Sequence, residues 1–153
     1  MLNPTLLRVS LWGGIAGFVA SLVVHVATLA GVVVSEAAFV LHLGVFVTFF
    51  PVVLGLVGLA KRNGVDPRDR GAQLALQLGV LRALPVWQKV AVGLIFVYAF
   101  VNFFLTFGNG LDPGTPPLRG FSGHWLAFYF FSAVLASYLL KAVGSAVPTA
   151  HEV

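Results

Sequence analysis

Four long apolar stretches dominate the pattern of hydrophobic and polar positions along the chain. They run over residues 11–34, 37–60, 90–107 and 121–140. Each is roughly 18–24 residues long, enough for a helix to cross a hydrocarbon core of about 30 Å. Backbone groups find no water in that core, so each stretch must be a helix that closes its own hydrogen bonds. The pattern therefore predicts an all-α, polytopic membrane protein, a single domain built as a bundle of four transmembrane helices.

Residues near the ends of these stretches are typical of helix boundaries. Ser35 predicts the N-cap of the second helix, and Ser122 predicts the N-cap of the fourth. Pro85 suits the first turn of the third helix, and Pro51 predicts a kink inside the second. Three tryptophans lie near span ends, where an aromatic belt forms: Trp12, Trp87 and Trp125. These signals support four separate helices.

The connection over residues 61–89 is the most polar part between the spans. It opens with Asn63-Gly64 and Asp66-Pro67, two pairs that signal turns. Leucines then recur at helical spacing, as Leu74, Leu78, Leu81 and Leu84. This spacing predicts a short amphipathic helix from about Arg68 to Leu84. It either lies on the membrane surface or folds over the helix ends as a linker.

Composition and charge give the chain an orientation. Of its 153 residues, 59% are apolar and only 9% are charged, whereas soluble domains carry about 25% charged residues. Eight of the nine basic residues fall on one predicted side: Arg8, Lys61, Arg62, Arg68, Arg70, Arg82, Lys89 and Lys141. Only Arg119 falls on the other. The positive-inside rule then predicts that both termini lie in the cytoplasm. The expected membrane is the plasma (inner) membrane. The net charge of +4 thus reports orientation, and the expected partner is the lipid bilayer rather than nucleic acid.

The residues that are missing narrow the chemistry. The chain has no cysteine, and its only methionine is Met1. This excludes disulfides, cysteine-ligated iron–sulfur clusters and thiolate zinc sites. The sequence contains no P-loop, no G-x-S-x-G motif and no constellation of paired carboxylates. We therefore expect a protein that is not an enzyme.

Polar residues inside the spans converge on one level of the bundle. His25 lies late in the first helix, His42 early in the second and His124 at the start of the fourth, so all three fall in the outer leaflet. Asn102, late in the third helix, reaches the same level. Polar groups are costly in a membrane helix and usually face the bundle interior. Imidazoles on facing helices can hold haem iron axially, or bind zinc or copper(II).

An aromatic pattern accompanies two of these histidines. The sequence H-x-x-x-F-x-x-F occurs twice, as His42, Phe46 and Phe49 and as His124, Phe128 and Phe131. Offsets of four and seven place both phenylalanines on the same helix face as the histidine, a wall suited to a flat porphyrin. We expect b-type haem, used for electron transfer and bound by His25, His42, His124, Phe46 and Phe128. The preferred axial pair is His25 with His42, on antiparallel neighbouring helices, and the alternative pair is His42 with His124.

Two other functions stay open. The chain fits a non-catalytic accessory or assembly subunit of a larger membrane complex, or a homo-oligomer, in which the histidines only bond helices together and no cofactor is bound. A third interpretation is a zinc or copper enzyme with His25, His42 and His124 as metal ligands. That enzyme needs an open coordination position and a general base, for which Glu36 is the candidate.

Two further stripes bear on how the helices pack. Gly13, Gly17, Ser21 and His25 recur every four residues, which predicts a close approach of a neighbouring helix and brings His25 towards it. Tyr98, Asn102 and Thr106 recur at the same spacing in the third span. This polar stripe is suited to orienting a histidine through hydrogen bonds.

Overall fold

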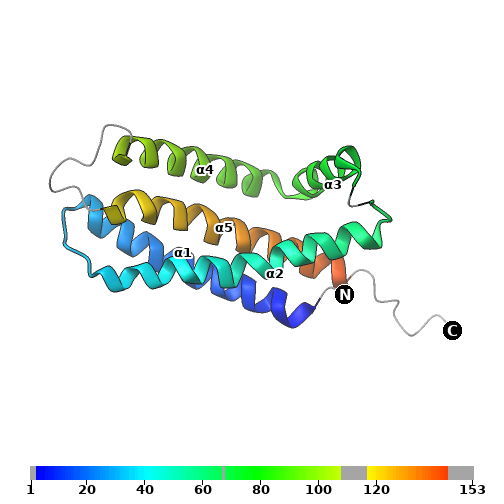
Figure 1. Cartoon of the computed structure of the whole chain (residues 1–153), viewed down its shortest axis with the longest axis horizontal. Coiled ribbons are helices and arrows are strands. Elements are labelled where there is room, and N and C mark those ends of the chain that lie inside the picture. Colours follow the sequence, from blue (N-terminus) through cyan, green and yellow to red (C-terminus); the bar gives the residue numbers. More distant parts are fainter. Residues whose placement is uncertain (1–2, 67, 108–116, 145–153) are drawn as a thin grey trace.

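The structure is all-α in the residues that it describes. It is a computed structural model that describes residues 3–66, 68–107 and 117–144. In chain order its elements are α1 (Pro4–Leu29), the single 3-10 turn η1 (Glu36–Phe39), α2 (Val40–Arg62), α3 (Arg70–Ala83), α4 (Val86–Phe107) and α5 (Pro117–Gly144). Figure 1 shows the four long helices packed lengthwise, with the short α3 at one end.

Four helical segments are long and apolar enough to cross a membrane. They are Pro4–Leu29, Ala37–Arg62, Val86–Phe107 and Leu118–Gly144. The chain is therefore an integral membrane protein by the length and composition of its helices. A fifth helix, α3, confirms the short helix expected in the 61–89 connection.

The first and last helices both begin before their predicted spans. α1 starts at Pro4, because the Asn3 side chain accepts hydrogen bonds from the backbone N–H groups of Thr5 (2.9 Å) and Leu6 (3.4 Å). It ends at Leu29, ahead of Gly31, which has a φ of +73°. α5 already starts at Pro117, so the prediction that Ser122 caps it is wrong.

Two other boundary predictions concern α2 and α4. The Ser35 hydroxyl accepts a hydrogen bond from the backbone N–H of Ala37 (3.2 Å), so Ser35 caps η1. The N-cap of α2 is Phe39, which makes no side-chain cap bond, so Ser35 does not cap α2 itself. Pro85 lies directly before α4 rather than in its first turn. Its carbonyl accepts hydrogen bonds from Gln88 and Lys89, the first bonds of that helix. α2 continues through Pro51.

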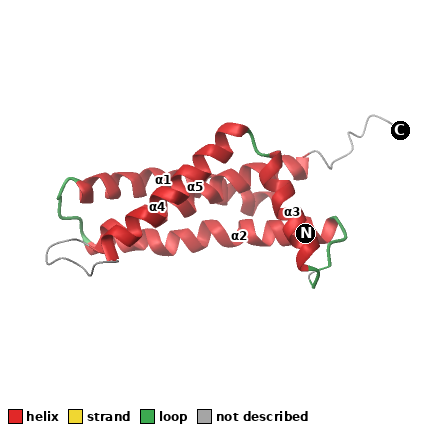
Figure 2. Cartoon of the chain, turned by 90° about the horizontal axis from the view of Figure 1, so that it is seen from above, coloured by secondary structure: helices red, strands yellow, loops and turns green. Residues whose placement is uncertain are grey.

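The helix α5 is the centre of the bundle. Half of its spanning segment is buried, whereas the other spans bury between 17% and 28% of theirs. α1, α2 and α4 all pack on α5, and α1 also packs on α2. α2 and α4 scarcely contact each other, so both are held by α5. Figures 1 and 2 show α5 between the other long helices.

Small residues let α1 approach α5 closely, as the spacing of glycines and Ser21 predicts. Gly14, Gly17, Ser21 and His25 are all buried on one face of α1. The register differs from the prediction at one position, because Gly13 faces Thr48 of α2 and its neighbour Gly14 meets α5. A Cβ atom at Gly14 would lie 3.0 Å from the backbone of α5, at both the Tyr129 oxygen and the Ala133 nitrogen.

Substitution of Gly14 by alanine is expected to destabilise the bundle by about 1–3 kcal/mol, because backbone atoms of α5 cannot turn aside for the added methyl group. Gly93→Ala in α4 is the matched control, since an added Cβ there has nothing within 4 Å. Alanine also favours a helix over glycine, so this control should be neutral or stabilising. Unfolding with sodium dodecyl sulfate in mixed micelles measures the free energy of unfolding of each variant. Equal stabilities for the two variants would contradict the close crossing.

Candidate functional site

The three predicted histidines lie at one end of the bundle, but in two different environments. His25 comes from the last turns of α1, His42 from the first turn of α2 and His124 from the second turn of α5. His42 and His124 line the same cavity, and His25 does not. The cavity therefore joins the pair that the sequence ranked second, and not His25 with His42.

The shared cavity, here called the aromatic cleft, lies between α2, α4 and α5. Its volume is about 330 Å³, within the range of roughly 300–1,000 Å³ found for small-molecule pockets. It is lined by His42, Val45, Phe46, Phe49, Phe103, Phe121, His124, Trp125 and Phe128. The wall exposed to the cavity is made of carbon atoms, so the ring nitrogens do not face into it. The cleft suits an apolar, flat occupant.

The two copies of the histidine–phenylalanine pattern meet in this wall. The ring of Phe49 in α2 lies 5.7 Å from that of Phe128 and 6.4 Å from that of Phe131, both in α5. Phe96 of α4 packs on the same two rings at 6.4 and 5.6 Å. These separations are typical of favourable aromatic pairs. Phe96 and Phe131 do not line the cleft themselves but pack against rings that do, and α4 contributes Phe103 to the lining. The site therefore includes a third helix that the histidine–phenylalanine pattern did not predict.

The sequence contains a pattern that predicts a role for α4 in the site, although its phenylalanines were not among the predicted site residues. Phe96, Phe100, Phe103 and Phe107 are spaced by four, three and four residues, which places them on one helix face. Phe103 lines the cleft and its ring lies 4.6 Å from that of His124.

The hydrogen bond of His42 sets its tautomer. The indole N–H of Trp125 donates to His42 Nδ1 at 3.1 Å. An indole nitrogen only donates, so Nδ1 must be the unprotonated nitrogen and Nε2 carries the proton of a neutral ring. His42 therefore presents a hydrogen-bond donor at Nε2. Iron ligation through that atom requires the other tautomer and the loss of the Trp125 bond.

His124 has the opposite tautomer. Its Nδ1 lies 3.3 Å from the carbonyl oxygen of Gly120, and since a carbonyl only accepts, Nδ1 is the donor. The Nε2 atom then keeps its lone pair. An imidazole whose second nitrogen donates to a backbone carbonyl is the usual arrangement of a metal-ligating histidine. Of the two histidines in the cleft, His124 has the tautomer that a metal ligand needs.

His25 is held in a hydrogen-bonded network of three helices. It is 2% exposed, its Nδ1 lies 2.8 Å from the Ser122 hydroxyl of α5, and its Nε2 bonds the Tyr98 hydroxyl of α4. The Ser122 hydroxyl donates in turn to the Arg119 carbonyl at 3.2 Å. Consequently Nδ1–H donates to Ser122 and Nε2 accepts from Tyr98. Both nitrogens are engaged, and neither has a free lone pair for a metal.

The polar stripe of α4 does orient a histidine, as its spacing predicts, through Tyr98. The next member of the stripe, Asn102, donates from its amide to the Arg119 carbonyl at 2.9 Å. Thr106 donates to the carbonyl of Asn102 at 2.7 Å within α4. Asn102 and Ser122 therefore meet at the same carbonyl oxygen of α5.

Trp125 is not part of an aromatic belt, contrary to the sequence-based prediction. It is 1% exposed and packs inside the core, whereas Trp12 and Trp87 are exposed on the surface of the bundle. Trp125 instead lies in the interior of the bundle, where it lines the cleft together with His124 and bonds His42. Position near a span end does not distinguish a buried from an exposed tryptophan.

The described residues contain no cluster of the kind that the predicted metal ligands require. Among them, no three histidine or acidic side chains are placed to hold a metal ion together. The network of His25 separates it from the two histidines of the cleft. The candidate base Glu36 lies outside the described side chains.

Comparison with known proteins found no matching family model, no similar curated protein and no similar solved structure.

Proposed function

We propose that this integral membrane protein binds a flat, conjugated, lipid-soluble redox cofactor in the aromatic cleft and uses it for electron transfer. One observation carries the proposal: His42 and His124, each from a copy of the same pattern, line one apolar cavity walled by aromatic rings. Haem b and the head group of an isoprenoid quinone share the chemistry of such a cofactor. Both are flat, conjugated rings with apolar faces that suit stacking on phenylalanine.

The arrangement of the helices gives this ligand a route of entry. α2 and α4 are both held by α5 and scarcely by each other, so the cleft between them opens towards lipid. A cofactor dissolved in the bilayer reaches the cleft without crossing a polar loop. We also propose that both termini are cytoplasmic and the membrane is the plasma membrane, because basic residues gather at the end that carries α3.

The two cofactors would use the histidines differently. Haem would be held by His124 through Nε2, with the N–H of His42 on the same cleft, once each ring had turned towards the cavity. A porphyrin would also occupy the adjoining cavity of about 430 Å³, which shares His124 and Phe128 with the cleft. A quinone head group would occupy the cleft itself, and one of its carbonyl oxygens would accept a hydrogen bond from the Nε2–H of His42 after the same turn of that ring.

Binding of the two cofactors to the purified protein tests the proposal. Haem is titrated by absorption, and a short-chain naphthoquinone by quenching of Trp125 fluorescence in a Trp12→Phe, Trp87→Phe background. One titration should saturate. If haem binds, His124→Ala should weaken its binding about 10- to 100-fold; if the quinone binds, His42→Ala should weaken it; Phe128→Leu should weaken either. Phe130→Leu is the matched control, since this ring packs on Phe18 of α1, away from the cleft. Absence of saturation in both titrations would overturn the proposal.

The network of His25 favours a second function, that of an accessory or assembly subunit with purely structural histidines. Its buried ring uses both nitrogens to bond α1 to α4 and α5. This function predicts that substitution of the histidines lowers stability or association while neither cofactor binds. The zinc or copper enzyme remains a third hypothesis, and elemental analysis without stoichiometric metal would exclude it.

A further inference from the structure

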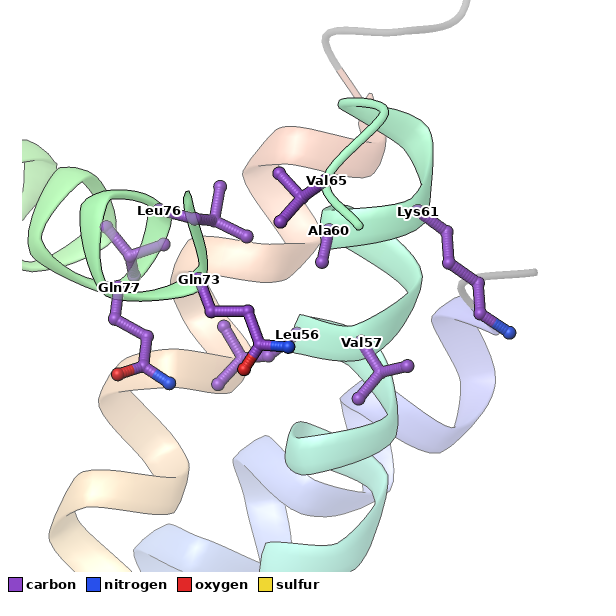
Figure 3. A pocket seen from close by; sticks show the side chains of 9 residues that line it. Leu56, Val57, Ala60, Lys61, Val65, Gln73, Leu76 and Gln77 are labelled. Atoms are coloured by element: carbon purple, nitrogen blue, oxygen red, sulfur yellow. The ribbon is translucent and has the colours of Figure 1, made fainter. Parts of the chain in front are cut away.

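The short helix α3 runs across the end of the bundle. Figure 2 shows it lying across the direction of the long helices, and Figure 3 shows it crossing beside the last turns of α2. It begins where the Asp69 side chain accepts a hydrogen bond from the backbone N–H of Ala72 at 2.9 Å. Because the long helices cross the bilayer, a helix that runs across their ends lies along the membrane surface.

One face of α3 anchors it to the bundle. Val80 is buried, and Leu76 points towards Val65 and Ala60 at the end of α2 (Figure 3). A slot of about 150 Å³ remains between the two helices, with apolar walls and with Gln73 and Gln77 among its lining residues. This packing fixes how α3 is rotated about its own axis.

A second apolar face of α3 is exposed in the part of the chain that the structure describes. Leu74, Leu78 and Leu81 are 56%, 41% and 39% exposed, and their spacing of four and three places them in one stripe. At about 100° per residue, Arg70 and Arg82 lie on the two sides of this leucine stripe. An apolar stripe flanked by arginines is typical of a helix that lies in a membrane interface.

The surroundings of the leucine stripe are strongly basic. Residues 61–89 contain six basic side chains and two acidic ones. Both acidic residues cap backbone turns: Asp66 accepts from the N–H of Arg68 at 2.8 Å, and Asp69 caps α3. Trp87 in the first turn of α4 is exposed, as is usual for tryptophan at the level of the lipid head groups.

We propose that α3 is an interfacial helix that binds anionic phospholipid. The leucine stripe inserts between the upper acyl chains, while Arg70 and Arg82 extend their apolar stems along the lipid and bring their guanidinium groups to head-group phosphates. Positive charge selects anionic over zwitterionic lipid, since each basic residue near such a surface favours binding about fivefold. This inference does not depend on a cofactor in the aromatic cleft.

Single-cysteine spin labelling tests the insertion, because the natural chain has no cysteine. The full-length Leu78→Cys protein is labelled with a nitroxide in vesicles of phosphatidylcholine and phosphatidylglycerol. Its label should be more accessible to oxygen, which concentrates in lipid, than to a water-soluble nickel complex. Ala75→Cys is the matched control on the neighbouring exposed face, and its label should show the reverse. Equal exposure of both labels to nickel would overturn the proposal. That result is expected if the stripe is the docking site of a soluble protein, because the purified protein in vesicles would then leave the stripe in water.

The lipid preference is tested separately with spin-labelled lipids. Spin-labelled phosphatidylglycerol should be immobilised around the protein several-fold more than spin-labelled phosphatidylcholine. The double variant Arg70→Gln, Arg82→Gln should lose most of this preference, and added salt should weaken it in the natural chain. Circular dichroism checks that the variant keeps its helix content. An unchanged lipid preference in a folded double variant would contradict the role of the two arginines.

Discussion

Replacement of Tyr129 by alanine is expected to lower the free energy of unfolding by about 3–5 kcal/mol, the range found when a large aromatic side chain is removed from a core. Tyr129 lies in the middle of α5 and is 2% exposed. Its ring fills the space that two glycines leave open, since a Cβ atom at Gly17 of α1 or Gly44 of α2 would overlap it. The ring therefore joins three helices, and its loss leaves a cavity where they meet.

The hydroxyl of the same residue contributes a smaller, separable part. It donates to the carbonyl of Leu41 in the first turn of α2 at 2.6 Å. Tyr129→Phe keeps the ring and should be destabilising by only about 1 kcal/mol, as for other hydrogen bonds between membrane helices. Tyr138→Ala, also in α5 but only partly buried, is the control. If unfolding in mixed micelles shows Tyr129→Ala to be no worse than this control, the three-helix junction is not where the bundle gains its stability.

The four spans were predictable because the thickness of the bilayer sets the minimum length of the apolar runs. The ends of the helices were less predictable, since a helix can continue beyond its apolar run. Asn3 and Pro4 start α1 in polar sequence, ahead of the apolar run. α5 likewise begins at Pro117, ahead of the apolar run that starts at residue 121. Hydropathy therefore places the membrane core of each helix but not its ends, and at α1 the start is set by the Asn3 cap.

For the candidate site, the sequence predicted how far along the bundle each residue lies and which residues share a helix face. It did not predict which side chains contact one another between helices. His25, His42 and His124 share a level because position along a helix follows from residue number. The phenylalanines lie beside His42 and His124 because offsets of four and seven are fixed by helix geometry. Which helices face one another depends on how each is rotated in the bundle. That rotation turns His25 towards Tyr98 and leaves the other two histidines to share the cleft.

The same rotation makes His25 the polar residue with the largest expected structural effect. Its ring bonds the Tyr98 hydroxyl of α4 on one side and the Ser122 hydroxyl of α5 on the other. α4 buries only 17% of its span and packs on α5 alone among the long helices to any extent, so the bond from His25 is its main polar link to α1. His25→Ala removes both bonds together with a buried ring, and we expect a loss of about 2–3 kcal/mol in unfolding free energy.

A double-mutant cycle of His25→Ala with Tyr98→Phe distinguishes this role from that of a cofactor ligand. Two groups that bond directly should show a coupling energy of about 0.6–1.7 kcal/mol, the range measured between membrane helices. The cycle of His42→Ala with Tyr98→Phe is the control and should be additive, because His42 bonds Trp125 instead. If His25 were instead a cofactor ligand, its substitution would abolish the haem absorption of the protein, and His25 would show no coupling energy with Tyr98. A coupling energy of zero in the first cycle would mean that the His25–Tyr98 bond does not hold α4, which would then depend on the Asn102 hydrogen bond and on its aromatic contacts with α5.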